Sequence, residues 1–291
     1  MNTHHRQPSH VTGLWLCAFL LLSCGSMAAT LTHTKSNDPK ETLVLQILKL
    51  AISKSGQENK YQYEAYDSFI TEARLFEMVK DNKISVMWAG TQEKYESELL
   101  PIRIPVLKGL LGHRIFIIRN GEQEKFNAVR SLEKLQQIPL GQGRFWGDTA
   151  VLKHNQMSVV APVKYASLFY MLEGGRFDFF PRAVHEPWSE VEARPELNLT
   201  VENNILLIYP FAMYFFVNRD STELAKNIET GFLAAIEDGS FDDLFFNHPM
   251  IQDALNQANL KQRKVFRLSN PNMSPMTPVD DKRLWLDIAT L

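Results

Sequence analysis

The spacing of apolar residues alternates between a helical and a strand period in the first part of the chain. Leu43, Ile47 and Leu50 recur every three to four residues after Asp38-Pro39, which supplies a cap and a proline for the first helical position, so we expect a helix that ends at Gly56. The segments 31–34 and 61–66 on either side alternate as strands do. The order strand, helix, strand is then repeated, with a helix expected at 71–79 and a strand at 84–88.

Strands and helices continue to alternate up to residue 258. The later expected strands are 113–118, 138–140, 159–160, 177–180, 205–209 and 213–218, and the later expected helices are 131–135, 148–154, 165–172, 183–192, 222–237, 242–246 and 251–258. Strands that alternate with helices in this way predict an α/β fold with parallel sheets.

The pattern restarts near residue 120, which predicts a second lobe inserted into the first. Extended segments at 115–119 and 213–218 flank the inserted block, so we expect them to form a two-strand hinge with a cleft between the lobes. The expected parts are a signal peptide (1–29), a first lobe (30–118 plus 215–268), a second lobe (119–214) and a C-terminal tail (269–291).

The first residues of the chain have the three parts of a secretory signal. A polar start is followed by an apolar run at 14–22 and by small residues at Ala28 and Ala29, where cleavage is expected, which predicts a periplasmic or secreted protein. Cys24 follows a small residue, so a lipoprotein is an alternative, and an uncleaved anchor is a third interpretation. Cleavage near Ala29 would remove both Cys17 and Cys24, and with them disulfides, thiol catalysis and cysteine-ligated metal.

Composition and charge narrow the function classes. The chain is 45% apolar, which excludes a disordered protein, and its 31 Lys and Arg against 33 Asp and Glu argue against nucleic acid as a partner. The sequence contains no G-x-S-x-G, H-E-x-x-H or G-x-x-x-x-G-K-[ST] motif and no histidine cluster at metal-ligand spacing. We therefore expect a monomer without cofactor, metal or catalytic activity.

Several segments resemble, in their order and spacing, periplasmic solute-binding proteins of the amino-acid-binding type, the extracellular solute-binding protein family 3. They are Asp81-Asn-Lys-Ile-Ser-Val-Met-Trp88, Leu132-Glu-Lys-Leu135 with Ile138-Pro-Leu-Gly-Gln-Gly143, Met171-Leu-Glu-Gly-Gly-Arg-Phe-Asp178, and Tyr214-Phe-Phe-Val217 with a helix ending Ala235-Ile-Glu-Asp-Gly-Ser-Phe241. The resemblance covers roughly residues 40–260. It implies a type II periplasmic-binding fold whose hinged cleft closes on a small solute and delivers it to a membrane partner, with no chemistry done.

The chain departs from that family at the two positions that hold an amino acid. Family members usually have an arginine soon after the strand matching 84–88, for the ligand carboxylate, and an aspartate after the strand matching 177–180, for its amino group. In this chain the stretch 89–95 contains no arginine, and the stretch 181–186 contains no aspartate. We therefore do not expect a free α-amino acid as the ligand. We expect a small polar solute that is anionic or partly aromatic.

A glycine-rich turn and an arginine supply the polar candidates for ligand contact. In Gly141-Gln-Gly-Arg-Phe-Trp-Gly-Asp-Thr149 a strand leads into a helix whose first N–H groups can hold an anion, which makes Arg144, Asp148 and Thr149 candidates, although Asp148 or Thr149 could simply cap the helix. Arg182 follows a strand and would face the crevice, or else pair with Glu186 or Glu190.

Aromatic residues near strand ends complete the set. Trp88, Tyr95, Trp146 and Phe180 could stack on a flat ligand or belong to the core, and Thr91 lies in the same turn as Tyr95. His185 beside Glu186 could suggest acid–base chemistry, but a lone capped or solvated histidine is the simpler interpretation.

Three functional hypotheses follow. The first is an exported solute-binding protein that works in uptake or sensing with a membrane permease or a sensor protein. The second is the same fold with a degenerate cleft, docking on a membrane partner as a scaffold or sensor. The third is a secreted hydrolase, which would require a nucleophile beside His185.

Overall fold

The computed structural model describes residues 1, 3, 28–35, 38–68 and 70–290. The segment expected to form the signal, including Cys17 and Cys24, lies outside these residues apart from residues 1, 3, 28 and 29. Among the described residues, no helix combines the length and the apolar character that crossing a membrane requires.

The first lobe is built on two small sheets. It contains β1 (Ala29–Thr34), α1 (Pro39–Lys54), β2 (Tyr61–Tyr66), α2 (Glu72–Lys80), β3 (Val86–Gly90), α3 (Glu93–Glu98), β4 (Leu100–Ile102), β11 (Met213–Val217), α9 (Thr222–Glu237) and α10 (Ser240–Asn247). β1 pairs in parallel with β2, while β11 lies antiparallel between β3 and β4. The Ser85 N–H donates to the Thr32 carbonyl over 3.0 Å, which places β1 beside the start of β3.

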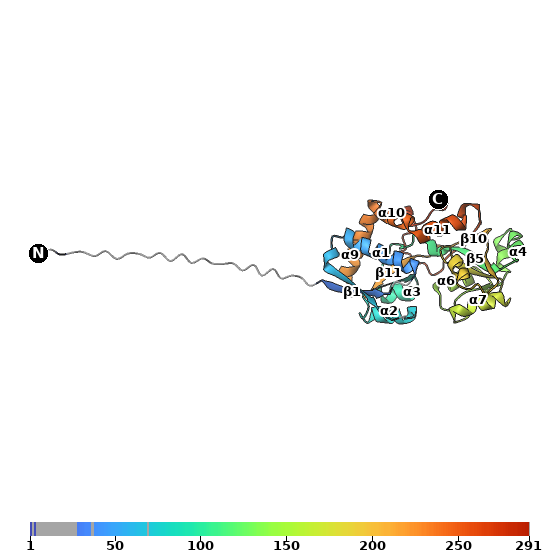
Figure 1. The fold of residues 1–291 in the computed structure, drawn as a ribbon, viewed down its shortest axis with the longest axis horizontal. Coiled ribbons are helices and arrows are strands. Elements are labelled where there is room, and N and C mark those ends of the chain that lie inside the picture. Colours follow the sequence, from blue (N-terminus) through green and yellow to red (C-terminus); the bar gives the residue numbers. More distant parts are fainter. Residues whose placement is uncertain (2, 4–27, 36–37, 69, 291) are drawn as a thin grey trace.

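The second lobe is built on one seven-stranded sheet in the order β12-β10-β5-β8-β6-β7, with β9 also paired to β5. Its elements are β5 (His113–Arg119), α4 (Gln123–Asn127), α5 (Leu132–Gln136), β6 (Leu140–Gly141), α6 (Gly147–His154), β7 (Val159–Val160), α7 (Tyr165–Glu173), β8 (Phe179–Ala183), α8 (Pro187–Glu192), β9 (Leu199–Val201), β10 (Ile205–Ile208), α11 (Pro249–Ala258) and β12 (Lys264–Arg267). Short 3-10 turns lie at Glu58–Lys60, Leu110–Gly112, Leu260–Gln262 and Lys282–Leu284. Figure 1 shows the two lobes side by side, with α1, α9 and β11 in one and β5, α6 and α7 in the other.

The sheets differ from the sequence expectation in direction and pairing. They are mixed rather than parallel, because β5 runs antiparallel to β8, β9 and β10, and β11 runs antiparallel to β3 and β4. The two segments expected to pair as a hinge, 115–119 and 213–218, belong to different sheets. Apolar periodicity reports which face of a strand is buried, but it does not report the neighbour or the direction. Strand pairing groups β5 and β12 with the second lobe, although the sequence placed most of β5 and all of β12 in the first. The exact residues at which one lobe ends and the other begins remain a proposal.

Helix α1 begins as the sequence predicts and anchors the core of the first lobe. The Asp38 side chain accepts the Glu41 N–H over 2.9 Å, and Pro39 occupies the first turn. The buried face of α1 packs against α9 at such short range that a Cβ on Gly231 would lie 1.7 Å from the Ala51 carbonyl oxygen. The absence of a side chain at Gly231 therefore sets the distance between these helices.

The C-terminal tail packs on the first connection between the lobes. The Leu286 N–H donates to the Lys108 carbonyl and the Lys108 ammonium donates to the Arg283 carbonyl, both over 2.8 Å. The Trp285 ring lies on Gly109, where a Cβ would approach it to 2.4 Å. The tail thus covers the segment that leads from β4 into β5.

We predict that Gly231→Ala destabilises the protein by about 1–3 kcal/mol, because the added methyl group must push α1 and α9 apart. Urea unfolding followed by circular dichroism measures the change. Thr230→Ala, at an exposed position of the same helix, is the control and should stay within about 0.5 kcal/mol of wild type. Equal stability of Gly231→Ala and wild type would contradict the close packing.

Candidate functional site

A cavity of about 460 Å³ lies between the two lobes. Its walls come from the start of α1, the link between β2 and α2 and the end of β3 on one side, and from β5, the start of α6 and β8 on the other. Its lining residues are Thr34, Lys35, Asp38, Lys40, Glu41, Ser68, Ile70, Glu72, Leu75, Trp88, Ala89, Gly90, Leu111, Arg114, Trp146, Gly147, Asp148, Arg182, Glu186, Phe211 and Met213. This volume is in the range of pockets that hold small molecules.

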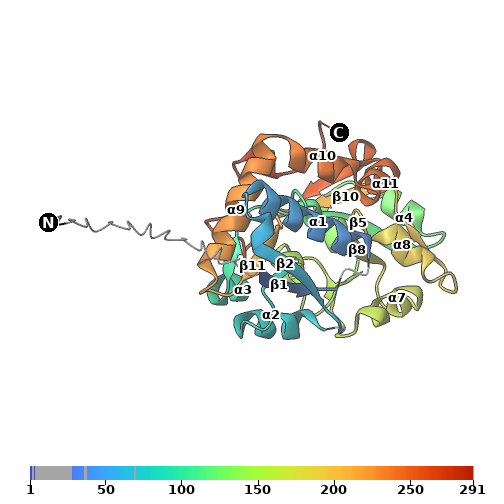
Figure 2. The ribbon, with the colours of Figure 1, turned by 60° about the vertical axis from the view of Figure 1, so that its left-hand side comes forward.

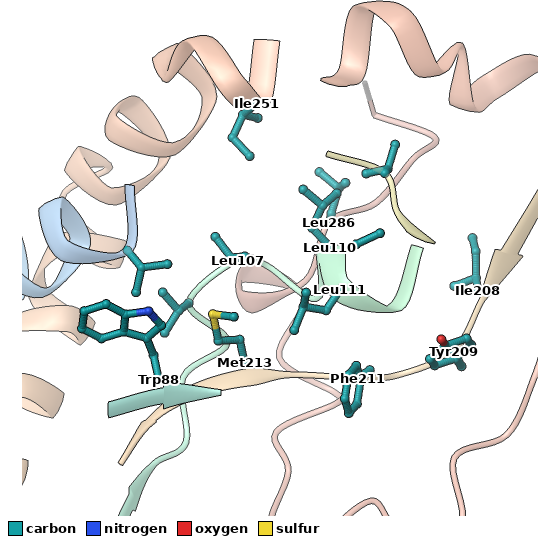
Figure 3. Packing of buried hydrophobic residues seen from close by; sticks show 14 of the residues in the cluster. Trp88, Leu107, Leu110, Leu111, Ile208, Tyr209, Phe211, Met213, Ile251 and Leu286 are labelled. Carbon is teal, nitrogen blue, oxygen red and sulfur yellow. The ribbon is translucent and has the colours of Figure 1, made fainter. Parts of the chain in front are cut away.

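The apolar floor of the cavity is formed by the connections between the lobes. Figure 3 shows Met213, Phe211 and Tyr209 following one another along the segment that joins β10 to β11, with Leu111 nearby. The Phe211 ring lies against glycines of both lobes: a Cβ would approach it to 2.6 Å at Gly90 and to 3.4 Å at Gly147. Phe211 is therefore the point at which the two lobes meet beneath the cavity.

Trp88 forms part of the wall on the first lobe. Its indole N–H donates to Glu41 Oε2 over 2.6 Å, and its ring stacks on His33 with the centroids 6.3 Å apart. Glu41 also pairs with Lys40, over 3.1 Å. The indole is thereby fixed at the foot of α1, with 6% of the residue exposed.

Trp146 forms part of the cavity wall on the second lobe. Its ring stacks on Phe180 at a centroid distance of 6.2 Å and an interplanar angle of 19°. The Arg182 guanidinium lies 5.1 Å from the Trp146 centroid, within cation–π range. Phe180, which is fully buried, supports Trp146 from behind.

Asp148 is held by three donors beneath this wall. It accepts from Arg114 over 2.8 Å, from the Gln142 amide over 2.7 Å and from the Tyr209 hydroxyl over 2.9 Å. Burial, and then the nearby Asp148 charge, raise the pKa of Tyr209 against the opposing effect of Arg114, so Tyr209 remains a donor. Asp148 therefore has a structural ion pair with Arg114 in addition to its place on the cavity wall.

Arg182 is also paired within its own lobe. It binds Glu190 with two bonds, of 2.7 and 2.6 Å, and lies 3.0 Å from Glu186. Burial alone would lower the pKa of Arg182, but these two carboxylates raise it. The ion pair anticipated from the sequence is present, and Arg182 still lines the cavity.

Glu186 is the carboxylate at which the charges of the two lobes meet. Burial would raise its pKa, but the positive charge of Arg182, with smaller effects of its other neighbours, lowers it to about 2. Lys40, on the first lobe, is one of these neighbours, and its own pKa is raised by Glu41 and Glu186 against the effect of burial. An attractive interaction thus crosses the cleft from α1 to the end of β8.

The structure brings four of the nine predicted site residues together on the cavity wall, namely Trp88, Trp146, Asp148 and Arg182. The other five lie outside the lining. The Thr91 hydroxyl donates to Glu96 over 2.6 Å, and the Tyr95 hydroxyl donates to Glu72 over 2.7 Å. The Thr149 hydroxyl donates to the Gly143 carbonyl over 2.6 Å, and the exposed Arg144 donates to the Ala161 carbonyl over 3.0 Å. Phe180 stacks on Trp146 behind the cavity wall.

Of the nine described charged residues that line the cavity, only Asp148 and Arg182 were proposed from the sequence as site residues. The seven that were missed are Lys35, Asp38, Lys40, Glu41, Glu72, Arg114 and Glu186. Asp38 was interpreted only as a helix cap, and Arg114 lies within a segment that was interpreted only as a strand. The charged residues Asp38, Lys40 and Glu41 lie at the start of a helix that follows a strand, and such helix starts point at the crevice of an α/β lobe. This position could have identified them as lining residues from the sequence.

The part of the chain that the structure describes gives no support for catalysis at His185. Neither ring nitrogen of His185 has a hydrogen-bond partner there, so no described nucleophile is activated by it. Among the same residues, no group of three His, Cys, Asp or Glu side chains could hold a metal ion.

The lowered pKa of Glu186 predicts a contribution to stability at neutral pH. This contribution is fully present above the ordinary carboxyl pKa of 4.5, and it is lost as the pH falls towards about 2. Glu186→Gln should therefore remove up to about 3 kcal/mol of the acid-induced loss of stability, as measured by urea unfolding between pH 7 and pH 2.5. Glu192→Gln, at an exposed position of α8, is the control, and an unchanged pH profile in Glu186→Gln would contradict the assignment.

No family model and no curated protein matches the chain. Solved structures do. The probable amino-acid ABC transporter extracellular-binding protein ytmK from Bacillus subtilis matches with a TM-score of 0.55 and 14% identity, over 77% of this chain and 99% of that chain. An ancestral arginine-binding protein bound to arginine matches with a TM-score of 0.52 and 16% identity, over 77% and 99%.

An amino acid ABC transporter substrate-binding protein from Streptococcus pneumoniae bound to L-arginine gives a TM-score of 0.51 and 12% identity, over 79% of this chain and 94% of that chain. At these identities the likeness shows the fold. The chain has the two-lobed, type II periplasmic-binding fold, and two of these three structural neighbours are amino-acid ABC transporter binding proteins.

Proposed function

We propose that this protein binds a small polar solute in the cavity between its lobes and closes around it, for uptake or for sensing. The observation that carries the proposal is the composition of the cavity wall: Trp88 and the start of α1 come from one lobe, and Trp146, Arg114 and Arg182 come from the other. A solute that touches both walls at once gains contacts that only the closed arrangement provides, so it favours closure.

The charges on the wall suit a solute with both positive and negative groups. Among the described residues, four cationic side chains and five carboxylates line the cavity, and Arg114 and Arg182 are already paired with Asp148, Glu186 and Glu190. A simple anion would find little uncompensated positive charge there. We therefore place a zwitterionic solute ahead of the anion considered from the sequence, with the two indoles offering surface to its apolar part.

The fold neighbours support a solute of this class. Two of the structural neighbours described above have arginine bound. In this chain, Glu186 follows β8 and could receive an amino group, although no aspartate stands in 181–186. Together with the signal expected at residues 1–29, these features support an exported binding protein. We propose further that it is a monomer without catalytic activity and that it delivers its solute to a membrane permease or a sensor protein.

The pairing of Arg182 also gives weight to the second hypothesis, a degenerate cleft in a module that docks on a membrane partner. Its guanidinium is paired with Glu190 and Glu186 of its own lobe. The double variant Arg182→Ala with Trp146→Ala distinguishes the two hypotheses, because it should abolish solute binding under the first and leave partner binding intact under the second.

A thermal shift assay with amino acids, small amines and small carboxylic acids tests the proposal. A solute at one hundred times its Kd should stabilise the protein by about 2.7 kcal/mol, which corresponds to a rise in Tm of about 5–10 °C. Trp146→Ala should weaken binding of that solute at least about tenfold in calorimetry, because it removes one wall of the cavity.

Phe145→Ala is the matched control, because Phe145 is the next aromatic residue along the chain but is 74% exposed and does not line the cavity. It should bind like wild type. The proposal fails if no solute raises the Tm, or if both alanine variants lose the same affinity.

A further inference from the structure

A second, larger cavity of about 1010 Å³ lies beside the first. It is bordered by the start of α1, by the segment from β8 through α8 and by α11, and Figure 2 shows α8 and α11 on the same side of the molecule. The two cavities share four lining residues, Asp38, Lys40, Arg182 and Glu186, which form the partition between them. Like the first cavity, the second is therefore walled by both lobes.

The charge of this second cavity is strongly negative. Among the described residues it is lined by five carboxylates, on Asp38, Glu186, Glu190, Glu192 and Asp253, against the two cations Lys40 and Arg182. The charge of Arg182 is already neutralised by its ion pairs with Glu186 and Glu190. Glu192 and Asp253 have no ion-pair partner in the part of the chain that the structure describes, so they leave uncompensated negative charge on two sides of the cavity.

Unsatisfied histidines provide a second, independent sign of a ligand. Both ring nitrogens of His185 and the Nδ1 of His248 are buried without a hydrogen-bond partner among the described residues, and both histidines line this cavity. Burial lowers the pKa of His185 to about 4, so its imidazole is neutral at neutral pH and keeps a free lone pair. Such an acceptor, placed among carboxylates, suits an N–H donor with positive charge.

The remaining lining suits an aliphatic stem. Trp188, Pro249 and Met250 supply apolar surface between α8 and α11. Methylene groups between charged nitrogens could lie against this surface while the nitrogens reach Glu192, Asp253 and His185. The cavity thus combines spaced anionic groups with an apolar lining between them.

We propose that this second cavity is a binding site for a linear aliphatic polyamine, held by Glu192 and Asp253 and hydrogen-bonded to His185. It is distinct from the solute site between Trp88 and Trp146 and does not depend on that function. Because its walls come from both lobes, an occupant that binds one lobe arrangement better than the other changes the affinity of the first cavity, and the solute changes the affinity for the polyamine by the same factor.

Isothermal titration with spermidine tests the site on the full-length protein. Wild type should bind spermidine, and the double variant Glu192→Gln with Asp253→Asn should bind it at least tenfold more weakly. Both residues are exposed, so the variant should fold like wild type. A control of equal charge change, Glu229→Gln with Asp243→Asn on the exposed faces of α9 and α10, should bind spermidine as wild type does.

Two further measurements locate the ligand. The imidazole ¹⁵N signals of His185, assigned with His185→Gln, should move on addition of spermidine and stay in place on addition of 1,4-butanediol, which has a similar stem without charge. Trp146→Ala should retain spermidine binding while it loses the solute of the first cavity.

The proposal is overturned if wild type does not bind spermidine at millimolar concentration, or if both double variants bind it equally. It is also overturned if the His185 signals do not respond, or if Trp146→Ala abolishes spermidine binding, because the cation would then occupy the first cavity. The first three of these results would not count against solute binding between the two indoles.

Discussion

The buried ionic network at the cleft face of the second lobe is the constraint on which the site depends. Arg114 with Asp148, and Arg182 with Glu186 and Glu190, are charges withdrawn from water, and they are tolerated because each is paired within hydrogen-bond distance. The network fixes β5, β8 and the starts of α6 and α8 relative to one another. It also decides which charges remain for a ligand, because most of the positive charge on this wall is already neutralised.

The two lobes meet this network from different sides. Trp88 is fixed by Glu41 at the foot of α1, while Trp146 is stacked on Phe180 and lies beside Arg182. Phe211 lies beneath them, in contact with glycines of both lobes, at the place where the chain crosses between the sheets. The partition formed by Asp38, Lys40, Arg182 and Glu186 then separates the solute cavity from a more acidic one, so one set of charged groups borders two sites of different character.

The sequence predicted the parts of this arrangement that depend on local patterns. The cap at Asp38, the succession of helices and strands and the two-lobed fold follow from periodicity and from a family resemblance, and Trp88, Trp146, Asp148 and Arg182 follow from their positions at strand and helix ends. Strand direction and the partners of β5 did not follow, because periodicity is the same in parallel and antiparallel strands. The pairing of Glu186 with Arg182 was anticipated, but the place of Arg114 and Glu186 on the cavity wall was missed, because it depends on residues distant in the chain.

Small-angle X-ray scattering with and without the solute that gives the largest thermal shift tests the central claim most directly. If the cavity between the lobes is the solute site, saturation should lower the radius of gyration of wild type as the lobes close, and Trp146→Ala at the same concentration should keep the value of the free protein. A radius of gyration that does not change when wild type is saturated would contradict closure around a solute.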